Sequence, residues 1–196
     1  MNNGVTNILV AGVGGQGVIL ASDIMADTFL EAGHDVKKSE VHGMAQRGGT
    51  VSSHVRFGKK VYSPIIKMGE VQYLCMMEKM ETLRCLNYCN KSTVILMDDI
   101  EVNPPMVNLG EMEYPRDIEE ILKNNFKNFH IIPATAIAAE VGTDRAANVV
   151  LTGVLSTFLD INEELWLKSL LARLPERLHD LNKKAFLAGR KALLDF

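Results

Sequence analysis

The chain has 196 residues, of which 47% are hydrophobic and 23% charged, and its formal net charge is −3. This composition is typical of a globular protein, so we expect residues 1–196 to form a single domain. The slightly acidic balance, with no basic block, argues against nucleic-acid binding. The sequence contains no recognisable signal peptide and no uncharged apolar stretch approaching the ~20 residues of a membrane span, so we expect a cytoplasmic location.

The first elements form an apolar strand at Thr6–Ala11, a glycine-rich turn, and a helix at Gly17–Ala32. The turn comprises Gly12, Gly14, Gly15, Gln16 and Gly17. Its glycines have the spacing G-x-G-x-x-G, in which the first permits a sharp bend, the second lets a ligand approach the backbone, and the third allows close packing of helix and strand. Because a helix N-terminus attracts anions, the turn is a candidate anion site. The alternative is a tight turn that binds nothing.

A short strand is expected at His34–Ser39, and the segment Glu40–Gly49 after it lacks the periodicity of a strand or helix. Polar loops on a rigid scaffold commonly carry function. Arg47 and the two glycines after it would present a guanidinium beside exposed N–H groups, which suits a phosphate or carboxylate. The alternative is a structural connection whose Arg and His bind neighbouring carbonyl groups. The candidate binding residues of this loop are His42, Gly43, Gln46, Arg47, Gly48 and Gly49.

The segment Thr50–Phe57 alternates between polar and apolar residues, which predicts a strand. Gly58–Lys60 is typical of a turn and Val61–Ser63 of a returning strand, so an antiparallel hairpin is expected here. His54 and Arg56 lie on the polar face of the first strand. They are either solvated or directed toward the same site as Arg47, and we include them among the candidate binding residues.

Strands alternate with helices through the rest of the chain. Further strands are expected at Val71–Met77, Ser92–Met97 and Phe129–Ile132. Helices are expected at Met80–Tyr88, Arg116–Asn125, Ala134–Val141, Ala146–Leu159, Asn162–Leu171 and Pro175–Leu194, whereas Asn103–Pro115 is expected to be irregular. This order predicts an α/β, Rossmann-like fold, with a mostly parallel sheet flanked by helices and an antiparallel hairpin insertion.

Several polar residues fall at positions where a role is expected. Asp98 and Asp99 end a predicted strand and are either part of a ligand site or, as we favour, turn and cap residues. Asn148 and Thr152 lie on a predicted buried helix and require hydrogen-bond partners.

Other features restrict the chemistry. Three cysteines are too few for a disulfide framework or an iron–sulfur cluster, and we interpret them as small buried side chains: Cys75, Cys85 and Cys89. A dinucleotide-binding enzyme requires an acidic residue about 20 residues after the glycines, and Glu40, near that distance, leads directly into the polar loop. Lys37 and Lys38 suggest a phosphate instead. No Ser–His–Asp arrangement or metal-ligand cluster is evident, so the residues by themselves predict an anion-binding domain without a defined reaction.

Four segments together resemble a known family. They are GVGGQG at Gly12–Gly17, EVHGMAQRGG at Glu40–Gly49, SSHVRFG at Ser52–Gly58 and YSP at Tyr62–Pro64. They resemble the gamma subunit or domain of 2-oxoacid:ferredoxin oxidoreductases, and the His-Gly-Met form of the loop resembles the beta subunit of the indolepyruvate branch. The resemblance continues through Ile132–Thr135, Asn148 and Asn182, and covers almost the whole chain.

The resemblance implies a multi-subunit enzyme that converts an aryl 2-oxoacid, coenzyme A and oxidised ferredoxin to an acyl-CoA, carbon dioxide and reduced ferredoxin. It also implies that thiamine diphosphate, Mg and iron–sulfur clusters are bound by a larger alpha subunit and none by this chain. The chain by itself is then expected to be inactive, and a homodimer is one form that it could take in isolation. The glycine turn and the Arg47 loop would then shape the intersubunit site near the coenzyme A phosphates. The alternatives are a gamma subunit for pyruvate, 2-oxoglutarate or a branched-chain oxoacid, and a stand-alone nucleotide-binding protein.

Overall fold

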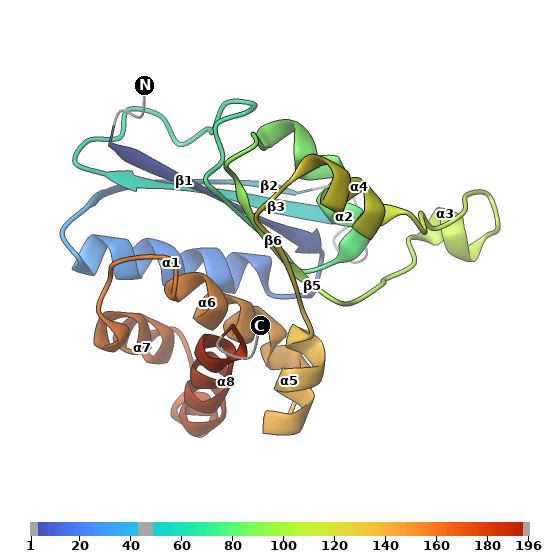
Figure 1. The fold of residues 1–196 in the computed structure, drawn as a ribbon. Helices are drawn as coiled ribbons and strands as arrows, with labels where there is room; N and C mark the ends of the chain where they lie inside the picture. Colours follow the sequence, from blue (N-terminus) through green and yellow to red (C-terminus); the bar gives the residue numbers. More distant parts are fainter. Residues whose placement is uncertain (1–3, 43–48, 194–196) are drawn as a thin grey trace.

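The computed structural model describes residues 4–42 and 49–193. Its strands and helices alternate along the chain (Figure 1). They are β1 (Val5–Val13), α1 (Val18–Glu31), β2 (Asp35–His42), β3 (Thr50–Gly58), β4 (Tyr73–Met76), α2 (Lys79–Cys85), β5 (Val94–Asp98), α3 (Pro105–Asn108), α4 (Ile118–Asn125), β6 (Phe129–Ile132), α5 (Ala134–Val141), α6 (Ala147–Ser156), α7 (Glu163–Ala172) and α8 (His179–Ala192). Short 3-10 helices occur at Leu86–Tyr88, Asp144–Ala146 and Glu176–Leu178.

The strands form one six-stranded sheet in the order β2-β3-β1-β4-β5-β6. Strand β3 is antiparallel to both of its neighbours, whereas β1, β4, β5 and β6 run parallel to one another. The predicted α/β architecture, with a mostly parallel sheet and an antiparallel part, is therefore confirmed.

The predicted hairpin is wrong in one of its strands. Strand β3 pairs with β2 and β1, and Val61–Ser63 does not form a strand. The reason is geometric: both edges of β3 are already hydrogen-bonded, so a returning segment has no free edge with which to pair. The backbone N–H of Val61 is instead bound by the Asp35 carboxylate, at 2.9 Å.

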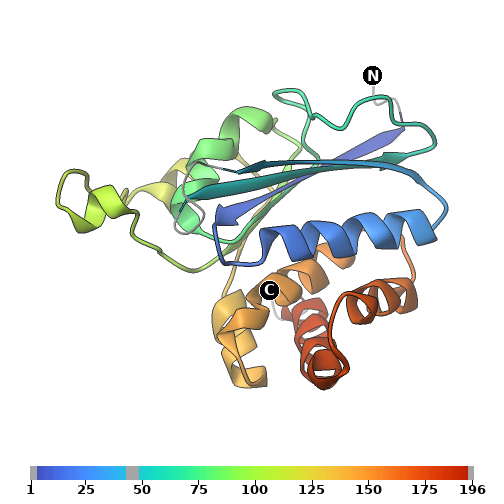
Figure 2. The same cartoon turned by 180° about the vertical axis from the view of Figure 1, so that it is seen from behind.

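Each face of the sheet has its own hydrophobic core. Ile8 and Val10 of β1 point into a core formed with α1, α5, α6, α7 and α8, and Leu9 and Ala11 point into a second core with α2 and α4. Figures 1 and 2 show these two groups of helices on opposite sides of the sheet. Because all four residues are almost fully buried, β1 is a central strand with no solvated face.

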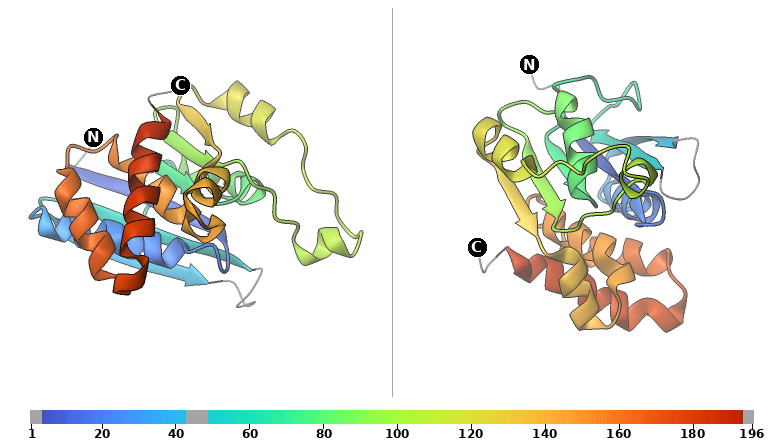
Figure 3. Two further views of the ribbon diagram at one scale, coloured as in Figure 1. Left: turned by 90° about the horizontal axis from the view of Figure 1, so that it is seen from below. Right: turned by 90° about the vertical axis from the view of Figure 1, so that its right-hand side faces the viewer.

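Helices α6 and α8 cross at close range beneath the sheet, and glycines permit the approach (Figure 3). A Cβ atom added at Gly153 would lie 2.1 Å from the carbonyl oxygen of Phe186, and one added at Gly189 would lie 2.0 Å from that of Val150. Backbone atoms of both helices would then have to separate. The two glycines therefore determine the distance between α6 and α8.

The predicted element boundaries differ from the observed ones in a few places. Strand β2 continues to His42, so the first three residues assigned to the polar loop, Glu40–His42, are part of a strand. The predicted helix Met80–Tyr88 is a shorter α2 followed by a 3-10 turn. The segment expected to be irregular contains α3, and Figure 3 shows that it projects from the body of the protein.

Within the described ranges, 4–42 and 49–193, no helix has the length and apolar character needed to cross a membrane.

We predict that Gly153→Ala lowers the free energy of unfolding by about 3 kcal/mol, because the new methyl group would overlap the backbone of α8. Gly33→Ala is the matched control, since Gly33 has φ +84° and a Cβ added there would have nothing within 4 Å. It should cost about 1 kcal/mol through backbone strain alone. Urea denaturation measures both. Equal destabilisation by the two substitutions would contradict the proposed close contact.

Candidate functional site

The glycine turn lies between the end of β1 and the start of α1, and its glycines have specific steric roles. Gly12 is still part of β1, and a Cβ there would lie 2.7 Å from both Gln16 Oε1 and Met77 Cβ. Gly17 caps α1 with φ +81°, and a Cβ there would lie 2.4 Å from Asn148 Nδ2. The chain therefore bends after Gly12 rather than at it, and the third glycine admits α6 as a close neighbour of α1.

The side chain of Gln16 closes this turn. Its Oε1 accepts a hydrogen bond from the Val13 N–H at 2.7 Å, and its Nε2 donates to the Met77 carbonyl at 2.9 Å. The amide thus joins the ends of β1 and β4 and satisfies two backbone groups that the strands leave unpaired. In this structure Gln16 supports the turn from within.

Two further hydrogen bonds attach the turn to its surroundings. The Gly14 N–H donates to the Gly49 carbonyl at 2.8 Å, which brings the end of the polar loop to the glycine turn. Asn148 Nδ2 donates to the Gly17 carbonyl at 3.1 Å, and Thr152 donates to the Asn148 carbonyl at 2.8 Å. The partners expected for these two polar residues of α6 are therefore present.

A hollow of about 250 Å³ opens beside the turn, at the carboxyl ends of the parallel strands. It is lined by Gly15, Gln16, Met77, Asp98, Ile100, Val102, Thr135, Asp144, Arg145 and Ala147. Strand β1 leads to α1 on one face of the sheet, and its neighbour β4 leads to α2 on the other. Ligands of open α/β sheets bind at such a switch between faces, so the hollow lies where this fold ordinarily binds them.

Asp98 forms the buried acidic wall of this hollow. Its carboxylate is 2% exposed and accepts hydrogen bonds from the Thr135 hydroxyl at 2.5 Å and the Thr135 N–H at 3.1 Å. Helix α5 has no cap from its own N-cap residue, Pro133, so Asp98 serves that purpose. Burial raises the pKa of Asp98, against the opposing effect of the bonds from Thr135. Asp98 is thus a cap residue, but for a helix that it binds at Thr135, 37 residues later in the chain, and not for the turn that follows it, and it also lines the hollow. The neighbouring Asp99 pairs with Lys79.

Arg145 and Thr135 line the hollow, and neither is among the candidate residues that the sequence suggests. Arg145 follows a glycine-ended helix and belongs to no motif, so local sequence offers no signal for it. Thr135 has two available signals, its place just after a strand and a proline, and the family resemblance that extends through Ile132–Thr135. Arg145 is exposed, and the described residues form no ion pair with it.

His54 and Arg56 are directed away from the glycine turn. In the β1–β3 register His54 lies opposite Leu9 and Arg56 opposite Asn7, toward the other end of β1 from Gly12. His54 is 3% exposed, its Nδ1 accepts from the Ile66 N–H at 3.1 Å, and burial lowers its pKa. The polar face of β3 is therefore covered by the connection between β3 and β4 instead of being solvated.

The polar loop itself lies mainly outside the described residues. Gly43, Gln46, Arg47 and Gly48 belong to residues 43–48, so the structure gives no position for them. The flank after the loop is anchored, since Thr50 Oγ1 accepts from Arg84 Nη1 at 2.8 Å. Together with the contact between Gly14 and Gly49, this places the end of the loop beside the turn.

The lysines of β2 are paired with carboxylates. Lys38 forms ion pairs with Asp23 of α1 and, at 2.5 Å, with Glu40, and Lys37 pairs with Asp35 at 2.6 Å. These contacts join β2 to α1 and to its own strand. The structure thus gives the two lysines a local role within the fold.

Glu78 is a buried carboxylate to which the sequence alone assigns no role. It is 1% exposed and accepts hydrogen bonds from the Glu81 N–H at 2.8 Å, the Val102 N–H at 3.1 Å and the Tyr114 hydroxyl at 2.5 Å. Burial and Glu78 both raise the pKa of Tyr114. Glu78 therefore caps α2 and holds both ends of the projecting segment that carries α3.

No group of three His, Cys, Asp or Glu side chains suited to a metal ion occurs among residues 4–42 and 49–193.

Comparison with known proteins connects this arrangement to one family. Residues 7–192 match the family model described as pyruvate ferredoxin/flavodoxin oxidoreductase. The chain is 34% identical to the indolepyruvate oxidoreductase subunit IorB of Thermococcus kodakarensis, over 95% of each chain. It is 36% identical to the subunit of the same name from Archaeoglobus fulgidus, over 93% of this chain and 92% of the relative. Identity to the 2-oxoglutarate synthase subunit KorC of Methanothermobacter thermautotrophicus is 25%, over 96% and 95%.

Solved structures share the fold. The gamma subunit of a keto/oxoacid ferredoxin oxidoreductase from Geobacter sulfurreducens superposes with a TM-score of 0.73, at 25% identity, covering 97% of this chain and 99% of that one. A 2-oxoglutarate:ferredoxin oxidoreductase from Magnetococcus marinus, solved with 2-oxoglutarate, coenzyme A and succinyl-CoA, superposes with a TM-score of 0.77 at 21% identity. It covers 99% of this chain and 32% of that one, so the same fold forms about a third of a longer polypeptide there.

We predict that Asp98→Asn makes stability less dependent on pH. Because burial raises the folded-state pKa of Asp98, its contribution is fully present below the usual value of 3.8 and is lost as the pH rises through the raised pKa. The free energy of unfolding of the wild-type protein should therefore exceed that of the variant by the largest amount at low pH. This difference should shrink toward neutral pH.

Urea denaturation of both proteins across this pH range measures the effect, with Asp99→Asn, at the exposed neighbouring carboxylate, as the control. A constant difference between wild type and Asp98→Asn would show that the Asp98 carboxyl titrates as it does in the unfolded chain.

Proposed function

The chain belongs to the pyruvate ferredoxin/flavodoxin oxidoreductase family and is a subunit of a ferredoxin-dependent 2-oxoacid oxidoreductase, and from this membership we propose that its enzyme oxidises indolepyruvate or another aryl 2-oxoacid. In the proposed reaction the carboxyl group of the 2-oxoacid leaves as carbon dioxide and the remaining acyl group forms a thioester with coenzyme A. The two electrons released reduce ferredoxin.

The choice of substrate in this proposal rests on one observation, the difference in sequence identity between two groups of relatives. Identity is 34% and 36% to the two indolepyruvate oxidoreductase subunits, against 25% to the 2-oxoglutarate synthase subunit, over similar lengths. The His-Gly-Met form of the polar loop agrees with the same branch. A pyruvate, 2-oxoglutarate or branched-chain oxoacid enzyme is the second candidate.

We further propose that a larger partner subunit binds thiamine diphosphate, Mg and the iron–sulfur clusters. The sequence of this chain has no Gly-Asp-Gly…Asn-Asn signature for the diphosphate and its magnesium, and no cysteine cluster. Burial raises the pKa of Cys75, Cys85 and Cys89 to about 12. Since a cluster is held by thiolates, these three side chains are poorly suited to ligate iron.

In this proposal the present chain contributes shape and positive charge to an intersubunit site. The glycine turn is rigid, because Gln16 and Asn148 brace it, and Gly15 is exposed at its tip. The anchored end of the polar loop lies beside it. Arg47, a few residues away along the chain, would then bind a coenzyme A phosphate through charge-assisted hydrogen bonds.

We expect this chain, recovered from its native cell extract by an affinity tag, to bring with it a larger subunit that contains thiamine diphosphate and iron. Mass spectrometry identifies the partner, and cofactor assays measure both components. The assembled enzyme should reduce ferredoxin faster with indolepyruvate than with pyruvate or 2-oxoglutarate. Recovery of the chain alone with a bound nucleotide would favour a stand-alone nucleotide-binding protein instead.

Arg47→Ala is expected to raise the KM of the assembled enzyme for coenzyme A by about 10-fold or more, because a charge-assisted hydrogen bond is worth about 1.5–3 kcal/mol. Arg177→Ala, at an exposed arginine far along the chain, is the control and should leave the KM unchanged. If Arg47→Ala altered neither the KM nor subunit assembly, the proposed phosphate contact would be wrong.

A further inference from the structure

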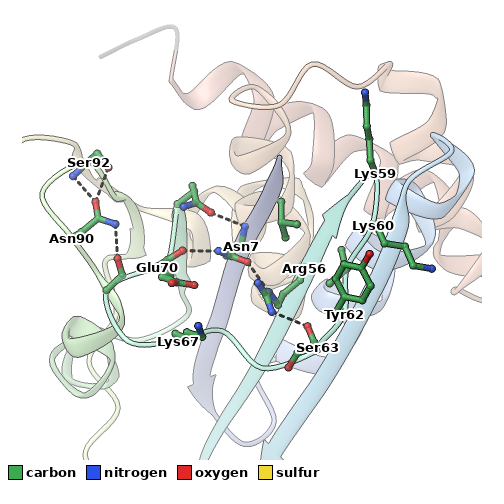
Figure 4. Close-up of a pocket in the computed structure, with 14 residues that line it drawn as sticks. Asn7, Arg56, Lys59, Lys60, Tyr62, Ser63, Lys67, Glu70, Asn90 and Ser92 are labelled. Atoms are coloured by element: carbon green, nitrogen blue, oxygen red, sulfur yellow. Dashed lines mark hydrogen bonds between the residues drawn. The ribbon is translucent and has the colours of Figure 1, made fainter. Parts of the chain in front are cut away.

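A second and larger hollow lies at the opposite edge of the sheet from the glycine turn (Figure 4). Its volume is about 730 Å³, and it is lined by Val5, Asn7, Arg56, Lys59, Lys60, Val61, Tyr62, Ser63, Lys67, Gly69, Glu70, Gln72, Asn90 and Ser92. These residues come from the start of β1, the end of β3, the connection that follows β3, and the turns before β4 and β5. At about 3.3 Å per residue, Asn7 lies roughly 17 Å along β1 from Gly12, so the two hollows are separate.

The lining is strongly cationic although the chain as a whole is acidic. The lining includes four cationic side chains, Arg56, Lys59, Lys60 and Lys67, and one carboxylate, Glu70, whereas the formal net charge of the protein is −3. Lys60 forms an ion pair with Asp35 at 3.7 Å. Lys59 and Lys67 are exposed and form no ion pair with any residue in 4–42 or 49–193. Lys59 and Lys67 therefore add positive charge to the hollow that no carboxylate of the described residues pairs with.

Arg56 supplies a fixed cation in the floor of the hollow. Its Nε donates to Asn7 Oδ1 at 2.8 Å, and its Nη1 donates to the carbonyl groups of Ser63 at 2.8 Å and Ile65 at 3.0 Å. Asn7 is itself 5% exposed and donates to the Glu70 carbonyl at 2.7 Å. These bonds hold the guanidinium without a carboxylate and leave Nη2 without a hydrogen bond to the described residues. An anion that binds there would not have to order this side chain.

We propose that this hollow binds an organic phosphate of nucleotide size. Several cations around a concave polar surface suit a ligand with more than one phosphate group, and the volume lies within the usual range for small-molecule sites. Tyr62, which is 89% exposed at the rim, offers an aromatic face on which a base can stack. On the far side, Asn90 and Ser92 are hydrogen-bonded to each other and Asn90 also donates to the Gly69 carbonyl, which makes that wall of the hollow polar and fixed (Figure 4).

The proposal is tested by titrating the full-length chain with ADP and with coenzyme A in a calorimeter at low and at moderate salt. Both ligands carry adenosine phosphates, and comparing their affinities identifies which source the site favours. We expect saturable binding with a Kd below about 1 mM that weakens as salt increases. Because the titration uses the isolated chain, its result is independent of whether the subunit assembles and whether its enzyme uses indolepyruvate.

The double variant Lys59→Ala/Lys67→Ala should raise the Kd by about 10-fold, since each removed charge lies at the rim and is only partly screened. Lys183→Ala/Lys184→Ala on α8 removes the same charge from two exposed positions elsewhere and should change the Kd less than about 2-fold. Tyr62→Ala should weaken ADP binding but leave inorganic pyrophosphate unaffected.

Three results would overturn the proposal. They are the absence of binding by both adenosine phosphates, equal effects of the two lysine double variants, and binding of poly-glutamate in place of ADP. The last result would identify the hollow as a surface for an acidic protein.

Discussion

The central strand β1 constrains the whole structure because the middle of the strand is used entirely for packing and for hydrogen bonds within the sheet. Its residues Ile8 to Ala11 are almost fully buried on both faces, and both of its edges are hydrogen-bonded, to β3 and to β4. Polar chemistry can therefore occur only at its two ends. At the carboxyl end the chain turns through glycines into α1, and at the amino end the cationic connection after β3 crosses it.

The carboxyl end owes its rigidity to side chains that face inward. Gln16 satisfies the backbone of two neighbouring strands, and Asn148 binds the carbonyl of Gly17 from α6. Loss of either amide would leave a buried backbone group unpaired, at a cost of about 1–3 kcal/mol. Because α6 is itself held by its close crossing with α8, the position of the turn depends on packing far from it.

Much of this fold can be predicted from the pattern of apolar residues, and the failures share a cause. Strand β1 and helix α1 have clear periodicity, and the helix predicted at Ala134–Val141 has the observed limits. The predicted partner of β3 is wrong because a local turn at Gly58–Lys60 gives no information about long-range pairing, which is decided by which edges of the sheet remain free. The glycine motif identifies a turn, yet nothing local indicates that Gln16 folds back into it.

The polar residues show the same difference between features that depend on local sequence and features that depend on long-range position. That Asp98 caps a helix is predictable only in part: its place at the end of a strand suggests a cap, but it binds its helix at Thr135, 37 residues later, and that helix is brought there by the pairing of β5 with β6. Grouping His54 and Arg56 with Arg47 has a weaker basis, because alternation identifies a shared face but gives no position along the strand. The register places them toward the amino end, where His54 holds Ile66 and Arg56 becomes part of a different hollow. Arg145, which reaches the carboxyl-end hollow from a separate turn, is visible only in three dimensions.

Both ends of β1 thus present hydrogen-bonded turns beside a hollow, with a fixed guanidinium, Arg56, at the amino end and a buried carboxylate, Asp98, at the carboxyl end. Burial raises the pKa of the three cysteines to about 12, and Glu78 is occupied by Tyr114 and by two backbone N–H groups. Under the proposed function, such a chain binds and orients anionic molecules, and the reaction takes place on the partner subunit. The same proposal follows from membership of the pyruvate ferredoxin/flavodoxin oxidoreductase family, in which the relative from Thermococcus kodakarensis is likewise one subunit of an enzyme.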